Sequence, residues 1–262
     1  MGEGRGRRGM VRSAQAGDPG VPTVSESRGH AGMKYLIINA DDYGISPGVS
    51  RGILEAHLRG VLTSTSFMTE TAASAIAAQR LVEAPGLSVG LHADLPPDLK
   101  HAADAEARAR DLLERQIDRF RALIGREPSH LDAHHNLHRD PRLAPAFVAV
   151  AQRHGLPLRE HSVVRYFSRF YGQWGGRSHF EHIGPASLAA MLETEVKEGF
   201  TELSCHPGYP DLDSSYNRER EVELRTLCDP QIPAVLERLG ITRISYRDLQ
   251  ALPSRVRPGA GA

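Results

Sequence analysis

Short runs of apolar residues alternate with helical patterns from Met33 onward. The first run, YLIINA at residues 35–40, is continuous in apolar character, as expected for a strand that is buried on both faces. Similar runs recur along the chain between Gly, Pro and polar residues. They predict strands at residues 35–40, 61–68, 87–91, 130–132, 156–160, 201–205 and 241–246.

Helical sequence lies between these predicted strands. The clearest start is Ser46, a helix-capping residue that is followed by Pro47 at the first helical position, and Gly60 ends this helix. A long amphipathic pattern at residues 102–124 is closed by Gly125. Further helical patterns occupy residues 71–83, 141–154, 185–198, 219–227 and 232–239.

This alternation predicts an α/β fold with a parallel sheet. About seven strands in a single domain of this length fit a closed or nearly closed barrel better than an open doubly wound sheet, which is the alternative. The residues after the first strand read DDYGIS and not GxGxxG, so the sequence does not predict a Rossmann-type phosphate loop.

Composition narrows the class of protein. The chain has 262 residues and a formal net charge of zero, so it lacks the basic excess of most nucleic-acid-binding proteins. No apolar run approaches the roughly 20 residues of a membrane span. Its cysteines are Cys205 and Cys228 alone, which favours a reducing cytoplasm over a disulfide-bonded secreted protein.

The two ends of the chain differ from the rest. Residues 1–32 are rich in Gly, Arg and Ser and lack the apolar segment of a secretion signal, which predicts a disordered N-terminal extension. Residues 254–262 predict a disordered tail. Met1, Met10 and Met33 are all candidate starts. The sequence therefore predicts one folded domain at residues 33–253.

Polar side chains follow four of the predicted strands. In a parallel α/β barrel the carboxyl ends of all strands open onto one face, which carries the active site. Adjacent aspartates often cap a helix and a lone histidine is often structural, but their coincidence at four strand ends favours a functional site. The residues expected to meet there are Asp41, Asp42, His92, Asp132, His134, His135, His138 and His206.

These residue types suit a divalent metal. Imidazole and carboxylate ligands favour Zn²⁺, Fe²⁺, Co²⁺ or Mn²⁺ over Mg²⁺. Two histidines and one carboxylate also leave positions open for water or substrate. Position alone does not choose among His134, His135 and His138 as the ligand that follows the fourth strand.

Four segments together resemble the YdjC-type carbohydrate deacetylases, which include chitooligosaccharide deacetylases and hopanoid-associated deacetylases. The segments are NADDYG (39–44), VGLH (89–92), HLDAHHNLH (130–138) and LSCHPG (203–208). The resemblance extends from about Lys34 to about Tyr246. It implies a distorted (β/α) barrel and the metal-dependent removal of acetyl from an N-acetylated sugar.

The resemblance also implies roles for individual residues. Asp42, His92 and His134 match the metal ligands of the family, Asp41 its general base and His206 its general acid or oxyanion partner. Where family members often carry a long insertion after GLH, this chain has the short GLHADLPPDLKHAAD. The aromatic-rich segment at residues 165–182, predicted to be a loop, is therefore expected to contact the sugar. The expected substrate-binding residues are His135, His138, Tyr166 and Trp174.

Other interpretations of the same residues stay open. The expected cofactor is a divalent metal, zinc or magnesium, with cobalt or manganese as alternatives. Two histidines and one carboxylate also describe a non-haem iron oxygenase site, and metal-dependent isomerases use barrels as well. A non-catalytic glycan-binding barrel is a third hypothesis. The expected partner is an N-acetylated saccharide, with no nucleic acid and no membrane span, and a homodimer is left open. Asp132 is expected to orient His134 or His206.

Overall fold

The structure is a computed structural model, and it describes residues 1–2 and 32–251. The predicted N-terminal extension and tail lie outside the described residues, apart from residues 1, 2 and 32. Their disorder, and the exact limits of the folded domain, therefore stay predictions.

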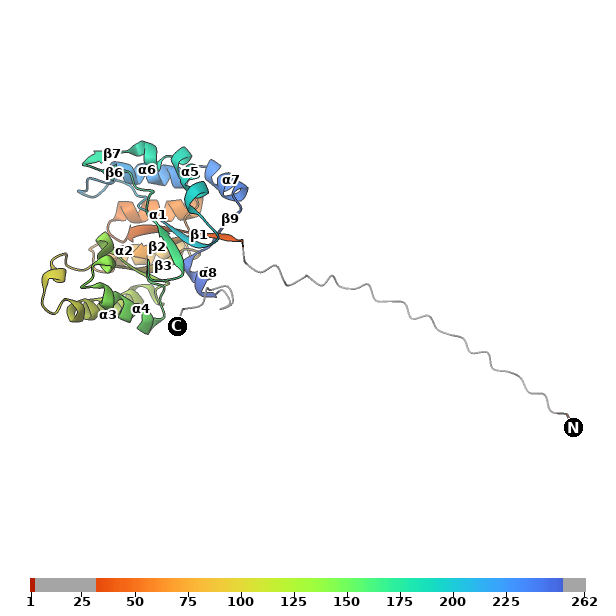
Figure 1. Cartoon of the computed structure of the whole chain (residues 1–262), viewed down its shortest axis with the longest axis horizontal. Helices are drawn as coiled ribbons and strands as arrows, with labels where there is room; N and C mark the ends of the chain where they lie inside the picture. Colours follow the sequence, from red (N-terminus) through yellow and green to blue (C-terminus); the bar gives the residue numbers. More distant parts are fainter. Residues whose placement is uncertain (3–31, 252–262) are drawn as a thin grey trace.

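Seven parallel strands form one sheet that curls into an open half-barrel around β1 (Figure 1). The path of neighbouring strands is β4 (Leu131–Ala133), β3 (Ser88–Ala93), β2 (Ser64–Phe67), β1 (Lys34–Tyr43), β8 (Gly199–Cys205) and β5 (Val164–Phe167), and β9 (Ile241–Arg243) pairs with the start of β1. In the described part of the chain β4 and β5 end this path, so the barrel stays open. The prediction of a distorted parallel α/β barrel of about seven strands is confirmed.

Helices cover the outside of the half-barrel. They are α1 (Pro47–Arg59), α2 (Ser74–Arg80), α3 (Ala105–Ile124), α4 (Ala144–His154), α5 (Pro185–Glu195), α6 (Asn217–Leu227), α7 (Gln231–Arg238) and α8 (Tyr246–Ala251). Short 3₁₀ helices are η1 (Leu81–Glu83), η2 (Leu99–His101), η3 (His134–Arg139) and η4 (Phe180–Ile183). In Figure 1, α5, α6 and α7 gather at one end of the sheet and α3 and α4 at the other. Ser46 caps α1 as predicted, because its hydroxyl accepts a hydrogen bond from the amide of Val49 at 3.1 Å.

The strand predicted at residues 156–160 is wrong. Only Leu158 forms a bridge, to Leu131 in β4, and Glu160 then turns the chain with a φ of 63°. The fifth strand of the chain is instead β5, within the segment that was predicted to be a loop. That segment also contains a small antiparallel hairpin of β6 (Gln173–Trp174) and β7 (Arg177–Ser178).

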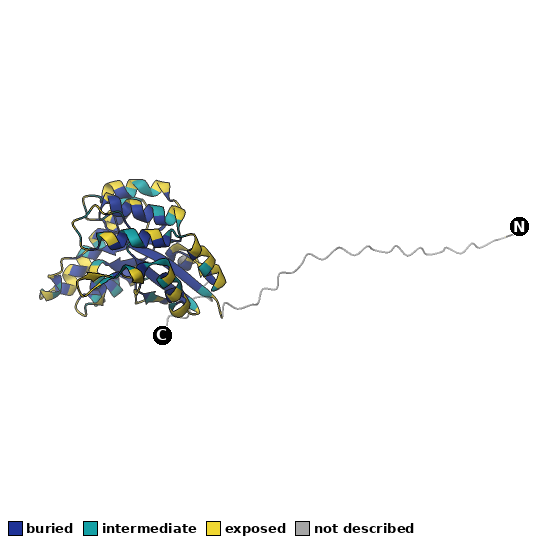
Figure 2. Cartoon of the chain, turned by 90° about the horizontal axis from the view of Figure 1, so that it is seen from above, coloured by how far each residue is buried: buried dark blue, intermediate teal, exposed yellow. Residues whose placement is uncertain are grey.

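Alternate residues of β1 face two different surroundings. Leu36, Ile38 and Ala40 pack into the large core beneath the helices. Tyr35 and Ile37 pack into a second cluster with residues of β5, β8 and α8. Figure 2 shows the sheet almost wholly buried, with exposed residues on the outer faces of the helices. Further along β1, the row of side chains that begins with Tyr35 and Ile37 becomes polar. This change places the functional side chains at the carboxyl end of the strands.

No helix in the described residues combines the length and apolar character needed to cross a membrane. Cys205 is buried, Cys228 is half-buried, and both are free thiols. The cytoplasmic location and the homodimer stay predictions.

Candidate metal centre and active site

A β-bulge at the end of β1 brings two neighbouring carboxylates to the same place. The pairing of β1 with β2 slips between Ala40 and Tyr43, so the two aspartates between them stand opposite one residue of β2. Successive side chains of a regular strand point to opposite faces, and the bulge removes that alternation here. Asp42 has a φ of 72°, an uncommon value for a residue other than glycine. This local strain aims the carboxylate of Asp42 into the same pocket as that of Asp41.

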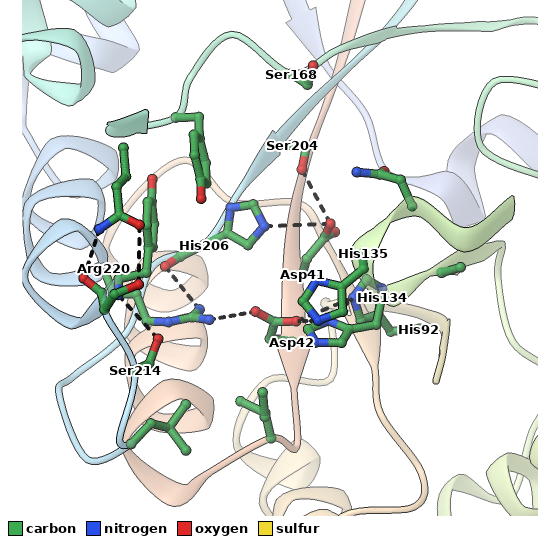
Figure 3. A pocket seen from close by; sticks show the side chains of 18 of the residues that line it. Asp41, Asp42, His92, His134, His135, Ser168, Ser204, His206, Ser214 and Arg220 are labelled. Carbon is green, nitrogen blue, oxygen red and sulfur yellow. Dashed lines mark hydrogen bonds and ion pairs between the residues drawn. The ribbon is translucent and has the colours of Figure 1, made fainter. Parts of the chain in front are cut away.

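Three ligand atoms from three strand ends meet beside the bulge (Figure 3). Oδ1 of Asp42 lies 3.3 Å from Nε2 of His92 and 3.1 Å from Nδ1 of His134, and the two nitrogens are 3.4 Å apart. Ligand atoms about 2.1 Å from one ion lie roughly 3.0–3.4 Å from one another in octahedral or tetrahedral geometry. The donor types and their spacing therefore fit a divalent metal ion.

Asp132 orients His92 for this role. Its Oδ1 lies 2.7 Å from Nδ1 of His92, an arrangement that leaves Nε2 of the ring to face Asp42. Burial alone would lower the pKa of His92, but Asp132 and Asp42 outweigh burial and hold that pKa well above its usual value. The structure thus pairs Asp132 with His92, whereas His134 or His206 is the partner expected from the sequence.

Arg159 lies behind Asp41, buried inside the half-barrel. Its guanidinium donates two hydrogen bonds of 2.8 Å to the carboxylate of Asp41 and also contacts Asp132 at 2.7 Å and Glu202 at 2.6 Å. Burial alone would raise the pKa of Asp41, but the charge of Arg159 outweighs burial and the pKa is lowered. The pair therefore keeps Asp41 ionised and fixed in orientation.

Arg220 binds the second oxygen of Asp42. Its Nη2 lies 2.6 Å from Oδ2, so Oδ1 stays directed at the two histidines. Burial alone would raise the pKa of Asp42, but Arg220 outweighs burial and holds that pKa well below its usual value. The ligand carboxylate is therefore ionised before any cation binds.

The chain turns sharply after His134. His135 and Asn136 have φ values of 55° and 54°, so two successive residues adopt the left-handed conformation. Each such residue costs roughly 1–3 kcal/mol, and conformations of this kind persist mainly at functional sites. The turn presents Nδ1 of His134 to Asp42 and packs the ring of His135 with its centre 4.0 Å from that of His134.

His206 stands on the other side of Asp41 (Figure 3). Its Nε2 lies 3.9 Å from Oδ2 of Asp41, and its ring meets the rings of Tyr171 and Tyr216 edge-on. Burial lowers the pKa of His206, which makes its protonated ring a stronger acid. The pocket that these groups line has a volume of about 610 Å³, within the roughly 300–1,000 Å³ of small-ligand sites.

Most of the predicted site residues line this pocket. The three candidate ligands, the candidate acid and base, His135 and Tyr166 are all part of its wall. His138 is not, because its side chain is fully buried and its Nε2 lies 3.1 Å from a carboxylate oxygen of Glu160. The structure therefore places His138 behind the wall, away from the position expected of a substrate-binding residue.

Trp174 lies beyond the pocket wall, on the β6–β7 hairpin. It is 45% exposed and one ring face stacks on His179, with the ring centres 3.7 Å apart. Its neighbour Gln173 does line the pocket and donates a hydrogen bond to the carbonyl of Ser215 at 3.0 Å. The hairpin thus extends the wall, with Trp174 at its outer edge.

Two arginines and one carboxylate that contact site residues were not predicted from the sequence: Arg159, Arg220 and Glu223. Arg159 gave a signal, since a charged residue within a predicted buried strand needs a buried partner. Glu223, whose carboxylate accepts a hydrogen bond from the backbone N–H of His206, shares one face of α6 with Arg220 and with Tyr216, the residue before the helix, at helical spacing. The partners of these side chains lie far away in sequence, so no local pattern names them.

The chain is similar to known proteins over most of its length. The model of the YdjC-like protein family matches residues 35–238. A carbohydrate deacetylase from Geobacillus stearothermophilus is 32% identical over 84% of this chain and 99% of its own. A chitooligosaccharide deacetylase from Serratia marcescens is 32% identical over 82% and 99% of the two chains. A crystal structure from Enterococcus faecalis V583 matches with a TM-score of 0.68 at 28% identity, over 83% of this chain and 99% of that one.

Proposed function

The chain belongs to the YdjC-like protein family, and on that basis we propose that it is a metal-dependent deacetylase of an N-acetylated sugar. The names of its relatives support the class of reaction. One observation carries the proposal: the pocket that holds the three ligand atoms also contains Asp41 and His206. Amide hydrolysis needs both a proton acceptor for water and a proton donor for the departing amine.

Asp42, His92 and His134 would hold the metal ion. When bound, a divalent ion supplies a Lewis acid, which lowers the pKa of water and polarises a carbonyl group. We propose zinc or magnesium, with cobalt and manganese as alternatives. The two imidazole ligands favour zinc over magnesium.

The acid and base of the chain move the protons of the reaction. Asp41 accepts a proton from the water that attacks the acetyl carbon, and Arg159 keeps its carboxylate ionised for this step. His206 donates a proton from Nε2 to the amide nitrogen as the C–N bond breaks, because a neutral amine leaves far more readily than its anion. The products are acetate and the free amino sugar.

The substrate contacts follow from the shape of the pocket. We propose that the sugar lies against His135 and Tyr166, which both line the pocket wall. Trp174 offers its exposed ring face at the outer edge, where a second sugar ring can stack. His138 has no part in this proposal because it is buried behind the wall.

The proposal is tested by acetate release from N-acetylglucosamine and its short oligomers, with the protein loaded in turn with each of the four metals. Asp41→Asn should lower turnover at least about 100-fold with unchanged metal content. Asp213→Asn, which removes another carboxylate of the pocket wall, is the control and should stay within about tenfold of the wild type. Absence of acetate with every metal and sugar, or wild-type turnover by Asp41→Asn, would contradict the proposal.

The same assay separates the alternatives that the sequence left open. An oxygenase of this ligand set would turn over only with Fe²⁺, oxygen and a 2-oxo acid, and it would release no acetate. A glycan-binding barrel would bind the oligomer without turnover. Acetate release in the absence of oxygen is the outcome that only the deacetylase gives.

A further inference from the structure

Helix α6 directs a row of side chains at His206. Tyr216 directly precedes the helix, and Arg220 and Glu223 follow on the same face, four and seven residues later. All three side chains are buried. The carboxylate of Glu223 accepts a hydrogen bond from the backbone N–H of His206, and Nη1 of Arg220 donates to the backbone carbonyl of His206 at 3.3 Å. Both ends of the His206 main chain are thus fastened to one helix.

The second oxygen of Glu223 links this helix to the segment that leads into the β6–β7 hairpin. The hydroxyl of Tyr216 donates to Oε1 of Glu223 at 2.6 Å and accepts from the backbone N–H of Gly172 at 2.8 Å. Gly172 lies just before the hairpin strand β6. A continuous chain of hydrogen bonds therefore runs from the hairpin wall through Tyr216 and Glu223 to His206. Bonds to a buried carboxylate are stronger than those between neutral groups.

The ring of His206 receives little orientation from its own nitrogens. Its Nδ1 is buried and has no hydrogen-bond partner among the residues that the structure describes. Its Nε2 lies 3.9 Å from Asp41, beyond hydrogen-bond distance. Catalytic histidines are commonly oriented by a carboxylate or carbonyl on the second ring nitrogen. Here the main-chain contacts, together with the edge-on rings of Tyr171 and Tyr216, have to set the position of the ring.

We propose that Glu223 is a positioning residue, which with Tyr216 fixes the place of His206 against the acyl group. This inference rests on the proposed role of His206 as the proton donor. A misplacement of about 1 Å can cost roughly 100-fold in rate. Glu223→Ala should therefore lower kcat about 100-fold with KM and metal content within about twofold of wild type. Glu223→Gln keeps one acceptor oxygen and should lower kcat only about tenfold.

Glu219→Gln is the matched control. Glu219 is buried one turn earlier on the same helix and accepts hydrogen bonds from Ser178 and Gln173 of the hairpin, but its contacts do not include His206. The substitution has the same chemistry and a similar burial. It should leave kcat within about twofold of the wild type, measured on di-N-acetylchitobiose with Zn²⁺.

The amide proton of His206, followed by NMR in isotope-labelled protein without metal, reports on the contact itself. It should move upfield in Glu223→Gln and stay in place in Glu219→Gln, since only Glu223 accepts its hydrogen bond. An unmoved amide, or equal kcat in the Glu223 and Glu219 variants, would overturn the proposal. If Glu223→Ala does not fold, Glu223→Gln decides. Absence of acetate release by the wild type would refute the proposed function instead, while the amide shift would still decide the contact.

Discussion

Arg159 is the side chain whose loss should destabilise the fold most clearly. It is 1% exposed and lies among three buried carboxylates, Asp41, Asp132 and Glu202. Replacement by methionine keeps most of the volume but leaves these carboxylates without their shared cation. Removing one partner of a buried ion pair costs about 3–5 kcal/mol. Glu202 offsets part of this cost, because burial already raises its pKa and it can take up a proton.

The expected loss for Arg159→Met is therefore about 3–5 kcal/mol, which corresponds to a fall in Tm of roughly 6–20 °C for a chain of this size. The assay is thermal and urea unfolding of metal-free protein by circular dichroism. Arg139→Met is the control, since Arg139 also makes two hydrogen bonds to one carboxylate, Glu160, at 2.6 Å and 3.0 Å, but is 47% exposed. Exposed pairs contribute about 0–1 kcal/mol. Equal Tm shifts for the two variants would show that the buried ion pairs of Arg159 contribute no more to stability than the exposed pair of Arg139.

Three further outcomes follow. Asp132→Asn should weaken Zn²⁺ binding about 10- to 100-fold by calorimetry, because it loosens His92, and an unchanged affinity would exclude that role. Burial raises the pKa of Glu223 from 4.5 to about 7, so its contribution to stability is present below the lower value and is lost as pH rises through the higher one. As pH rises from about 5 to about 8, the free energy of unfolding of the wild type, measured with urea, should fall by up to about 3 kcal/mol more than that of Glu223→Gln. Equal falls in the two proteins would contradict this. Trp174 is the one tryptophan of the chain, so a chitooligosaccharide should shift the intrinsic fluorescence and glucose should not, whereas an unchanged spectrum would remove Trp174 from the sugar site.

Much of the fold could be predicted from local pattern. A continuous apolar run identifies β1, because a strand covered on both faces carries few polar residues at its centre. The predicted strands at residues 61–68, 87–91 and 201–205, which mix apolar residues with small polar ones, coincide with β2, β3 and β8. The edge strand β5 was not predicted, because its sequence, VRYF, is only half-buried and contains no continuous apolar run. At residues 156–160 a strand was predicted where none forms. Arg159 in this segment binds carboxylates of other strands, and Glu160 turns the chain away from the sheet.

The candidate site was predictable as far as strand ends determine it. Parallel strands bring Asp42, His92 and His134 to one face wherever their exact boundaries lie. The side-chain directions were not predictable, because they depend on the bulge in β1 and on two left-handed residues after His134. For the same reason, His138 could not be assigned to the far side of the wall from spacing alone.

The proposed chemistry depends on one metal ion held by Asp42, His92 and His134, and this ligand set is tested by substituting His134 and, separately, its neighbour His135. Elemental analysis of protein dialysed after loading with Zn²⁺ gives the metal content per chain. This ligand set predicts about one ion per chain in the wild type and in His135→Ala, and little or none in His134→Ala. Full metal content in His134→Ala, or its loss in His135→Ala, would contradict it.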